Sequence, residues 1–338
     1  MIYVHVPFCR SFCTYCDFYS EIACRGKDAE AVERYVSGIC EEAARRRDEI
    51  AGTVATDTLY IGGGTPSVLP LIAFRRILDA LGGVRAYSEF TVEVNPEDIV
   101  EKGAEYASGL RALGVNRISM GVQSLDDGLL RWMNRRHDAD GARKAFRILR
   151  EAGFDNISVD VIFGISRLDA GTLARTLDEL ISWGPEHVSA YQLSIEDGSA
   201  LAEMVAKGLY EEAPEEQCRA QYELICNKLR DAGFEHYEIS NWAVPGRRAK
   251  HNSAYWTRQP YVGLGPGAHS LSIDGERQVR SWNSQELSGW TPECEILSPE
   301  EIREERIMLG MRTAEGIDGR RIPEKDWFIS DSIIAGLI

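Results

Sequence analysis

Three cysteines near the amino terminus constrain the fold and chemistry of this chain more than any other feature. Cys9, Cys13 and Cys16 are spaced C-x3-C-x2-C, directly after a short apolar run that is typical of a strand. A loop this tight can direct three sulfurs into one small volume, and short cysteine runs of this kind hold iron–sulfur clusters. Most such clusters take four thiolates, so three would leave one iron open to another ligand.

Zinc, a disulfide and ordinary core packing are the alternative explanations. Structural zinc sites use four nitrogen or sulfur ligands, and the sequence has no second C-x2-C arm or H-x3-H arm. Disulfides are rare in a reducing cytosol, and the amino terminus lacks the basic and apolar regions of a signal peptide. The other cysteines have no metal-binding spacing and are expected to be reduced and mostly buried: Cys24, Cys40, Cys218, Cys226 and Cys294.

Up to residue 195 the chain alternates between short β-branched runs and longer stretches with helical periodicity. This alternation is typical of βα units on a parallel sheet. The expected strands are Tyr3–Val6, Thr58–Ile61, Thr91–Val94, Arg117–Met120, Ile157–Ile162 and Val188–Leu193. The expected helices are Ala29–Ile50, Ile72–Leu81, Ala104–Leu113, Ala139–Ala152 and Thr172–Trp183. Six such units predict an α/β fold, a partial (β/α)6 TIM-like barrel, rather than a closed barrel of eight.

Polar or glycine-rich groups follow or end each expected strand. They are the cysteine loop, Gly62–Pro66, Glu93–Pro96, Gly121–Ser124, Asp160–Gly164 and Ala190–Gln192. Glycine lets a backbone approach a ligand closely, and a polar group on an apolar strand is costly to bury without a partner. Because parallel barrels carry their chemistry at the carboxyl ends of the strands, we expect one shared site there.

The cysteine spacing, with an aromatic residue before the third cysteine, resembles the radical S-adenosylmethionine (SAM) superfamily. The runs His5–Cys9 and Tyr15–Phe18 resemble its branch of coproporphyrinogen III dehydrogenases (HemN) and heme chaperones (HemW). In this superfamily SAM binds the open iron of a [4Fe-4S] cluster, and an electron from the cluster cleaves a carbon–sulfur bond to release a radical.

This resemblance implies the roles of individual residues. It makes Cys9, Cys13 and Cys16 the cluster ligands. The SAM contacts that it implies are Tyr3, Tyr15, Gly63, Gly64, Thr65, Glu93, Gln123, Arg135, Asp160 and Ala190. Tyr3 and Tyr15 could equally be core aromatics, and Arg135 could equally be a solvated charge.

A second motif lies in residues 201–298, which composition predicts to be a loop-rich α+β cap over the barrel mouth. It contains an expected helix at 214–230 and an expected strand at 236–239. The run His251-Asn252-x-x-Tyr255-Trp256 resembles a signature of the HemW branch that is associated with heme binding. The resemblance implies His251 as an axial heme ligand and the three other side chains as its neighbours. Packing of the cap is the alternative for each of them.

The expected organisation is a barrel over residues 1–200, the heme-associated cap over 201–298, and the start of a small helical domain over 299–338. The last segment begins with an expected helix at Pro299–Arg312 and is shorter than the family resemblance implies.

Two functions are compatible with the resemblance. The first is a heme chaperone, which binds heme, a [4Fe-4S] cluster and SAM and delivers the heme to an acceptor protein. The alternative is an oxygen-independent coproporphyrinogen III dehydrogenase, which decarboxylates two propionates. Three features favour the chaperone. Phe18 stands where the dehydrogenases have a further cysteine, the chain starts directly at the first strand, and the His251 motif is present. A radical SAM enzyme for an unrelated small molecule is a third class.

The charge of the chain limits its partners. A formal net charge of −15 and a pI near 5.0 argue against nucleic acid as a partner. No run of 18 apolar residues occurs, so no membrane span is expected and the chain is predicted to be cytoplasmic. The expected partners are heme or porphyrin, a heme-acceptor protein and an electron donor, with any membrane contact made through the acceptor only.

Overall fold

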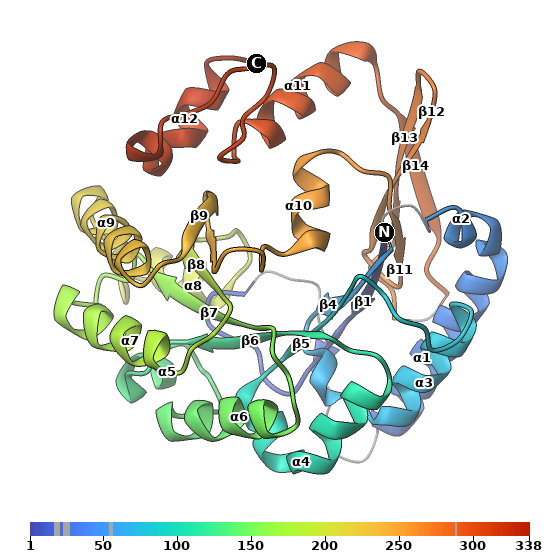
Figure 1. Ribbon diagram of the computed structural model, residues 1–338, viewed down its shortest axis with the longest axis horizontal. Coiled ribbons are helices and arrows are strands. Elements are labelled where there is room, and N and C mark those ends of the chain that lie inside the picture. Colours follow the sequence, from blue (N-terminus) through green and yellow to red (C-terminus); the bar gives the residue numbers. More distant parts are fainter. Residues whose placement is uncertain (17–20, 23–27, 54–56, 288) are drawn as a thin grey trace.

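The computed structural model describes residues 1–16, 21–22, 28–53, 57–287 and 289–338, so Phe18 and Cys24 lie outside the described residues. Its centre is a nine-stranded sheet in the order β11-β1-β4-β5-β6-β7-β8-β10-β9 (Figure 1). The six middle strands are parallel: β1 (Ile2–Val6), β4 (Thr58–Gly63), β5 (Glu89–Val94), β6 (Arg117–Gln123), β7 (Ile157–Phe163) and β8 (His187–Gln192). The predicted partial barrel of six parallel strands is therefore confirmed.

Helices connect these strands and cover the outside of the sheet. They are α1 (Asp28–Arg45), α2 (Arg47–Gly52), α3 (Leu71–Ala80), α4 (Pro96–Ala112), α5 (Asp127–Trp132), α6 (Ala139–Glu151) and α7 (Ala170–Ser182). The single helix predicted at 29–50 is broken at Arg46 into α1 and α2. Helix α4 begins eight residues earlier than predicted, and it is kinked at Gly103, whose φ of 69° is outside the helical region.

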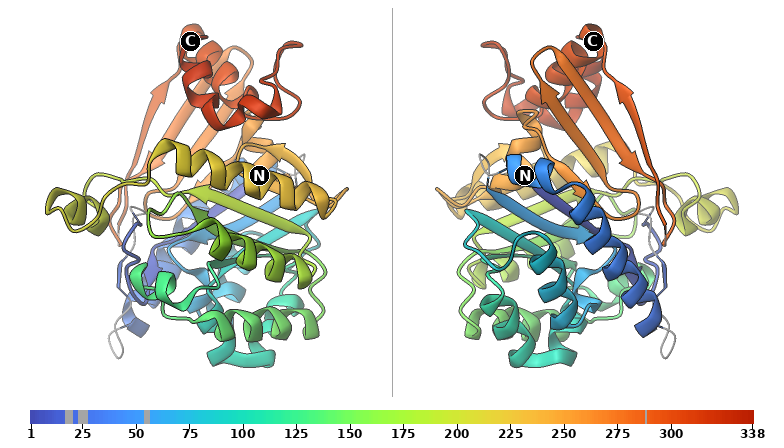
Figure 2. Two further views of the ribbon diagram at one scale, coloured as in Figure 1. Left: turned by 90° about the vertical axis from the view of Figure 1, so that its left-hand side faces the viewer. Right: turned by 90° about the vertical axis from the view of Figure 1, so that its right-hand side faces the viewer.

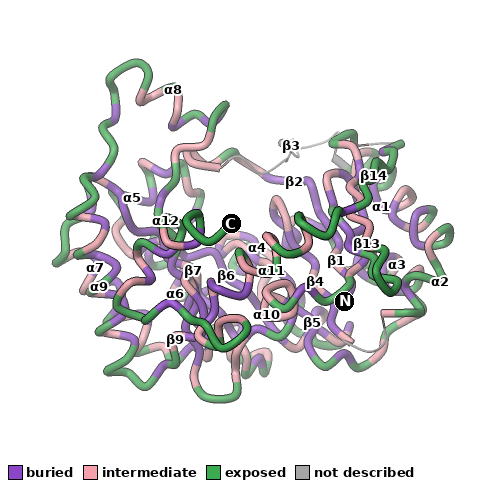
Figure 3. Tube along the Cα trace, turned by 90° about the horizontal axis from the view of Figure 1, so that it is seen from above, coloured by how far each residue is buried: buried purple, intermediate pink, exposed green. Residues whose placement is uncertain are grey.

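The strands alternate between an apolar and a polar face. Val4, Leu59 and Val92 are fully buried in the hydrophobic core. Alternate positions, such as Tyr60 and Glu93, lie on the other face, because successive side chains of a strand point to opposite sides. Figure 3 shows the buried strands in the interior, with exposed helix surfaces around them. This arrangement places polar side chains inside the barrel, where they can form a site.

The segment after β8 differs from the predicted cap. Helices α8 (Ala200–Ala206) and α9 (Glu215–Asp231) precede β9 (Glu235–Glu238) and β10 (Asn241–Ala243), which join the main sheet beside β8. At the other edge, β11 (Val262–Leu264) pairs with β1. The predicted helix at 214–230 and strand at 236–239 are thus present, but three short strands widen the barrel sheet instead of forming a loop-rich cap.

Helix α10 (Lys250–Trp256) carries the predicted heme motif, and it lies at the amino-terminal ends of β4 and β5. The carboxylate of Glu89, the first residue of β5, accepts hydrogen bonds from the backbone N–H groups of Lys250 and His251, both at 2.8 Å. A buried anion at a helix amino terminus satisfies N–H groups that have no partner within the helix. This contact holds α10 at the end of the barrel opposite to the strand ends that carry the cysteine loop.

The carboxyl-terminal part stands to one side of the barrel (Figure 2). It consists of a small antiparallel sheet, β12 (His269–Asp274), β13 (Arg277–Asn283) and β14 (Pro292–Ile296), followed by α11 (Pro299–Gly310), the 3-10 helix η3 (Glu324–Ile329) and α12 (Ser330–Ala335). Helix α11 matches the predicted helix at 299–312. Among the described residues, no helix is both long enough and apolar enough to cross a membrane. The domain boundaries at 200 and 298 stay predictions.

Candidate functional site

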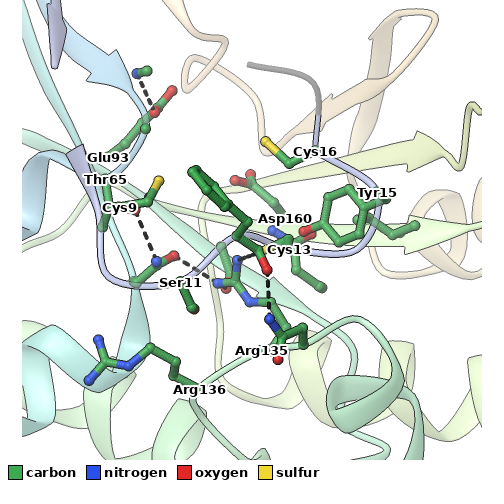
Figure 4. A pocket seen from close by; sticks show the side chains of 18 of the residues that line it. Cys9, Ser11, Cys13, Tyr15, Cys16, Thr65, Glu93, Arg135, Arg136 and Asp160 are labelled. Atoms are coloured by element: carbon green, nitrogen blue, oxygen red, sulfur yellow. Dashed lines mark hydrogen bonds between the residues drawn. The ribbon is translucent and has the colours of Figure 1, made fainter. Parts of the chain in front are cut away.

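The three cysteines of the amino-terminal motif line one pocket at the carboxyl ends of the parallel strands, with a volume of about 600 Å³ (Figure 4). Most of the residues that the family resemblance implies for SAM line the same pocket: Tyr15, Gly63, Gly64, Thr65, Glu93, Gln123, Arg135 and Asp160. Tyr3 and Ala190 are not among the described residues that line it. The shared site expected from the strand ends is therefore a single physical pocket.

The cysteine loop is anchored to the turn that follows α5. The backbone N–H of Thr14 donates to the carbonyl oxygen of Met133 at 3.0 Å, and its hydroxyl donates to that of Trp132 at 2.9 Å. The side-chain amide of Asn134 donates to the carbonyl oxygen of Phe12 at 2.7 Å. These bonds attach the loop to the turn after α5 and so orient its cysteines.

Two of the cysteine sulfurs have polar contacts inside the pocket. The Sγ of Cys9, a buried residue, lies 3.5 Å from the hydroxyl oxygen of Thr65. The Sγ of Cys13 accepts a hydrogen bond from Nη1 of Arg135 at 3.4 Å. A Cβ at Gly64 would lie 2.7 Å from the carbonyl oxygen of Phe8 and 3.1 Å from the Cys9 sulfur. Glycine at position 64 is thus required for the cysteine loop to pack against the loop after β4.

Within the described ranges, no three His, Cys, Asp or Glu side chains come together closely enough to hold a single metal ion. The three cysteines are instead arranged around a cavity (Figure 4). A four-iron cluster binds each thiolate through a different iron, so its ligands do not meet at one point as those of a single ion do.

Glu93 lies in this pocket between two hydrogen-bond donors. The hydroxyl of Tyr60 donates to Oε1 at 2.6 Å, and the backbone N–H of Gly63 donates to Oε2 at 3.0 Å. Burial raises the pKa of Glu93 to about 7, although both hydrogen bonds act in the opposite direction. A Cβ at Gly62 would lie 2.9 Å from Oε1, which explains the glycine beside this carboxylate. Glu93 can therefore change charge near neutral pH.

Asp160 and Gln123 add further polar atoms to the pocket. Burial raises the pKa of Asp160 to about 6, and the hydroxyl of Ser119 lies 3.4 Å from each of its carboxylate oxygens. Gln123 has a φ of 67° at a bulge in β6, a conformation that is uncommon for residues other than glycine. Its Oε1 is buried without a hydrogen-bond partner among the described residues, as is Nε of Arg135. These atoms are suited to a polar ligand.

Sequence reasoning missed several residues that line the pocket, among them Tyr60, Asn95, Arg136 and Tyr191. Tyr60 could have been found from the period of β4, because it alternates with Leu59 and Ile61, which face the core. Asn95 belongs to a polar segment that was recognised at the end of its strand. Tyr191 likewise belongs to the segment Ala190–Gln192, which was expected at the shared site but was assigned no role, whereas the position of Arg136 depends on tertiary structure.

The predicted heme residues lie elsewhere. The described residues that line the pocket do not include His251, Asn252, Tyr255 or Trp256. His251 is fully buried, with Nδ1 2.9 Å from the hydroxyl of Thr58 and Nε2 3.0 Å from that of Tyr255. Burial lowers the pKa of His251 to about 3, so its imidazole is neutral at physiological pH. The assignment of these residues to heme stays a prediction.

Comparison with known proteins identifies the family. The model of the radical SAM superfamily matches residues 3–180, which is more than half of the chain. The heme chaperone HemW of Bacillus subtilis (strain 168) is 34% identical over 96% of this chain and 86% of its own length. The radical S-adenosyl methionine domain-containing protein 1, mitochondrial, of Bos taurus is 33% identical over 94% of this chain and 74% of its own length.

The fold is also similar to that of a solved structure. Coproporphyrinogen III oxidase (HemN) from Escherichia coli, described as a radical SAM enzyme, superimposes with a TM-score of 0.74 at 20% sequence identity. The match covers 92% of this chain and 75% of that one. At this level of identity the likeness concerns the fold alone.

Membership of the superfamily implies a [4Fe-4S] cluster and SAM, and the pocket residues fit both groups. Three cysteine side chains are the donors that the cluster requires, and they line the same cavity as Glu93 and Asp160 and the unbonded polar atoms described above. The family model covers more than half of the chain, and the relatives named HemW match it over nearly its whole length, so the chain belongs to the radical SAM superfamily, as a HemW-like member.

Proposed function

We propose that this protein is a heme chaperone, which binds heme and delivers it to an acceptor protein. The observation that carries the proposal is the similarity over nearly the whole chain to proteins named heme chaperone HemW. That of Bacillus subtilis is 34% identical over 96% of the chain, and that of Mycobacterium tuberculosis (strain ATCC 25618 / H37Rv) is 32% identical over 99%. The acceptor and an electron donor are further partners that the proposal requires.

In this proposal Cys9, Cys13 and Cys16 hold the cluster, which supplies the open iron for SAM and an electron when it is reduced. The carboxylates of Glu93 and Asp160 and the guanidinium of Arg135 line the pocket around that position. A carboxylate suits the amino group of SAM, and a guanidinium suits its carboxylate because both carboxylate oxygens can be engaged. We assign these side chains to binding and orienting SAM.

His251 is the axial heme ligand in the proposal. Its low pKa keeps the imidazole in the neutral form that ligates iron. Both ring nitrogens lie at hydrogen-bond distance from hydroxyl groups, so ligation through Nε2 requires the side chain of Tyr255 to turn away. Because His251 is fully buried, heme must also displace part of α10 to reach it. Asn252, Tyr255 and Trp256 would then contact the porphyrin. A cytoplasmic location remains a prediction, since the Bos taurus relative is named mitochondrial.

Anaerobic reconstitution followed by a heme titration, monitored by absorbance, tests the proposal. We expect the wild-type protein to bind about one heme per chain, and His251→Ala to lose affinity by at least about tenfold, because it removes the axial ligand. His269→Ala is the matched control, since His269 is an exposed histidine on β12. Its affinity should equal that of the wild type.

Two results would contradict the chaperone function. One is a wild-type protein that takes up no heme. The other is conversion of coproporphyrinogen III by the reduced protein supplied with SAM, which would favour the dehydrogenase. Unchanged heme affinity in His251→Ala would show that the ligand is a different residue.

A further inference from the structure

The side chain of Asn95 is hydrogen-bonded to one residue that contacts Cys9 and to another that contacts Cys13. We propose that it is a positioning residue for the iron–sulfur cluster, which fixes the hydrogen-bond donors that reach the sulfurs of Cys9 and Cys13. The proposal concerns the cluster ligands and holds whether or not the chain binds heme.

The side-chain amide of Asn95 bridges two residues from different parts of the barrel. Its Oδ1 lies 2.7 Å from Nη2 of Arg135, and its Nδ2 lies 3.2 Å from the hydroxyl oxygen of Thr65. The orientation of the amide follows from its partners. Arginine has donors and no acceptor, so the atom that faces Arg135 must be the oxygen, and the NH2 group must face Thr65.

The bridged residues contact one sulfur each. Thr65 Oγ1 lies 3.5 Å from Sγ of Cys9, and Arg135 Nη1 donates to Sγ of Cys13 at 3.4 Å (Figure 4). Because the hydroxyl oxygen of Thr65 accepts a hydrogen bond from Asn95, its own proton is available for the sulfur. A thiolate is only an acceptor, so both contacts become N–H or O–H donation to sulfur when a cluster is bound.

The backbone of Asn95 is itself held in place. Its N–H donates to the hydroxyl of Ser67 at 3.1 Å, and that hydroxyl donates to Asp98 Oδ2 at 2.7 Å. Ser67 and Asp98 are both fully buried. Asn95 is also the residue between the end of β5 and the start of α4, so two regular elements fix its position.

The backbone of Gly121 packs closely against the amide and the guanidinium. A Cβ at Gly121 would lie 3.3 Å from Nη2 of Arg135 and 3.4 Å from Oδ1 of Asn95. The carbonyl oxygen of Gly121 accepts a second hydrogen bond from that Nη2 at 2.8 Å. The guanidinium is thus held by Asn95 and Gly121 on one side while it donates to Cys13 on the other.

Hydrogen bonds to the sulfurs are one of the factors that set the reduction potential of a cluster, because they stabilise the more negative, reduced form. The donors Thr65 and Arg135 lie 70 positions apart in the sequence, and Asn95 bonds to both of them. Loss of Asn95 should therefore weaken both donations and make the cluster harder to reduce, while its cysteine ligands remain.

An anaerobic redox titration of the reconstituted protein, followed by electron paramagnetic resonance, tests this role. At the wild-type midpoint potential, we expect Asn95→Ala to have a ratio of reduced to oxidised cluster about tenfold lower and Thr65→Val about threefold lower. The ratio in the double variant should be lowered by less than the roughly thirtyfold product of the two single effects, because Asn95 acts partly through Thr65. Asn116→Ala should match the wild type. Asn116 also bridges two groups, the Phe90 N–H and the Tyr87 carbonyl, but at the amino-terminal end of β5.

Iron content and thermal unfolding are measured on every variant, so that a folding defect is recognised. Wild-type midpoints in both Asn95→Ala and Thr65→Val would overturn the proposal. A shift in Asn116→Ala as large as that in Asn95→Ala would also overturn it. If Asn95→Ala assembles no cluster, Thr65→Val decides alone, and a wild-type midpoint in that variant refutes the proposal.

Discussion

Glu93 carries a carboxyl group whose pKa of about 7 results mainly from burial. Only its ionised form can pair with the amino group of SAM, the contact to which it is assigned. We therefore expect SAM affinity to rise with pH, by up to about tenfold per pH unit below 7, and to level off above 8. Isothermal titration of the reconstituted protein at pH 6, 7 and 8 measures this dependence.

Glu93→Gln and Asp160→Asn separate the two acids. Glu93→Gln should bind SAM more weakly and nearly independently of pH over this range, whereas Asp160→Asn should retain the dependence because Asp160 titrates lower, near 6. The free energy of unfolding of the protein without ligands depends on pH in the opposite direction to the SAM affinity. The pKa of Glu93 is raised by folding, so its contribution to stability is complete below about pH 4.5 and is lost as the pH rises through 7. Equal SAM affinity of the wild type at pH 6 and 8 would contradict this account.

At the residue scale, the sequence identified those site residues whose side chains are chemically unusual for their position, such as a carboxylate on an apolar strand. The cysteine spacing and the carboxylates on apolar strands identified residues that the structure brings to one pocket. Tyr60 and Asn95 were not assigned roles, because their roles are defined by partners. Tyr60 matters through its bond to Glu93, and Asn95 matters through Arg135, and the sequence alone does not reveal either pairing.

At the scale of elements, the position of helix α10 depends on a buried carboxylate at its first turn. The carboxylate of Glu89 is buried and accepts two N–H groups of the first turn of α10. Glu89→Gln replaces one carboxylate oxygen with an NH2 group, which donates hydrogen bonds and cannot accept one from α10, and it removes the charge. We therefore expect a loss of about 1–3 kcal/mol in the free energy of unfolding. Hydrogen exchange should become faster at the amides of 250–256, while the iron content is unchanged.

Glu301→Gln is the matched control for this prediction. Glu301 also receives a hydrogen bond from a backbone N–H, that of Ser298 in the capping box of α11, but both residues are exposed. Its replacement should cost less than that of Glu89, because solvent can satisfy the exposed groups. Equal losses in the two variants would show that burial of the Glu89 carboxylate has no special importance.

At the element scale, the six parallel strands were predictable because each has a strong local pattern that is followed by a helix. Strands β9, β10 and β11 have three or four residues each. Strand β9 pairs locally with β10, but β10 and β11 join the main sheet through β8 and β1, which are distant in the sequence. Val262 of β11 pairs with Ile2, which is 260 positions away in the sequence. A local pattern of this length carries too little information to fix such a partner, so this part was interpreted as a cap.

Across the whole molecule, Tyr60 connects the predicted heme residue to the SAM pocket. Its ring packs against that of His251 at a centroid distance of 5.2 Å, and its hydroxyl donates to Glu93 at 2.6 Å. If the proposed sites are correct, heme at His251 and SAM at Glu93 both act on this side chain. We expect saturating SAM to change the heme Kd by about fivefold or more, and heme to change the SAM Kd by the same factor, since coupling is reciprocal.

Tyr60→Phe tests the connection because it keeps the ring and removes the hydroxyl. Heme titrations with and without SAM should then give the same Kd. Tyr87→Phe is the control, since Tyr87 is buried and its hydroxyl has no hydrogen-bond partner among the described residues. This control should retain the wild-type coupling. Coupling of wild-type size in Tyr60→Phe would exclude Tyr60 as the link, without bearing on whether heme binds.

The iron content of the cysteine variants tests the assignment of the cluster ligands most directly. After anaerobic reconstitution, the wild type and Cys294→Ala, which alters an exposed cysteine of β14, should each hold about four iron and four sulfide ions per chain. Cys9→Ala, Cys13→Ala and Cys16→Ala should each lose most of both. A full complement of iron and sulfide in Cys13→Ala, with the spectrum of the wild type, would contradict the assignment of these three thiolates to the cluster.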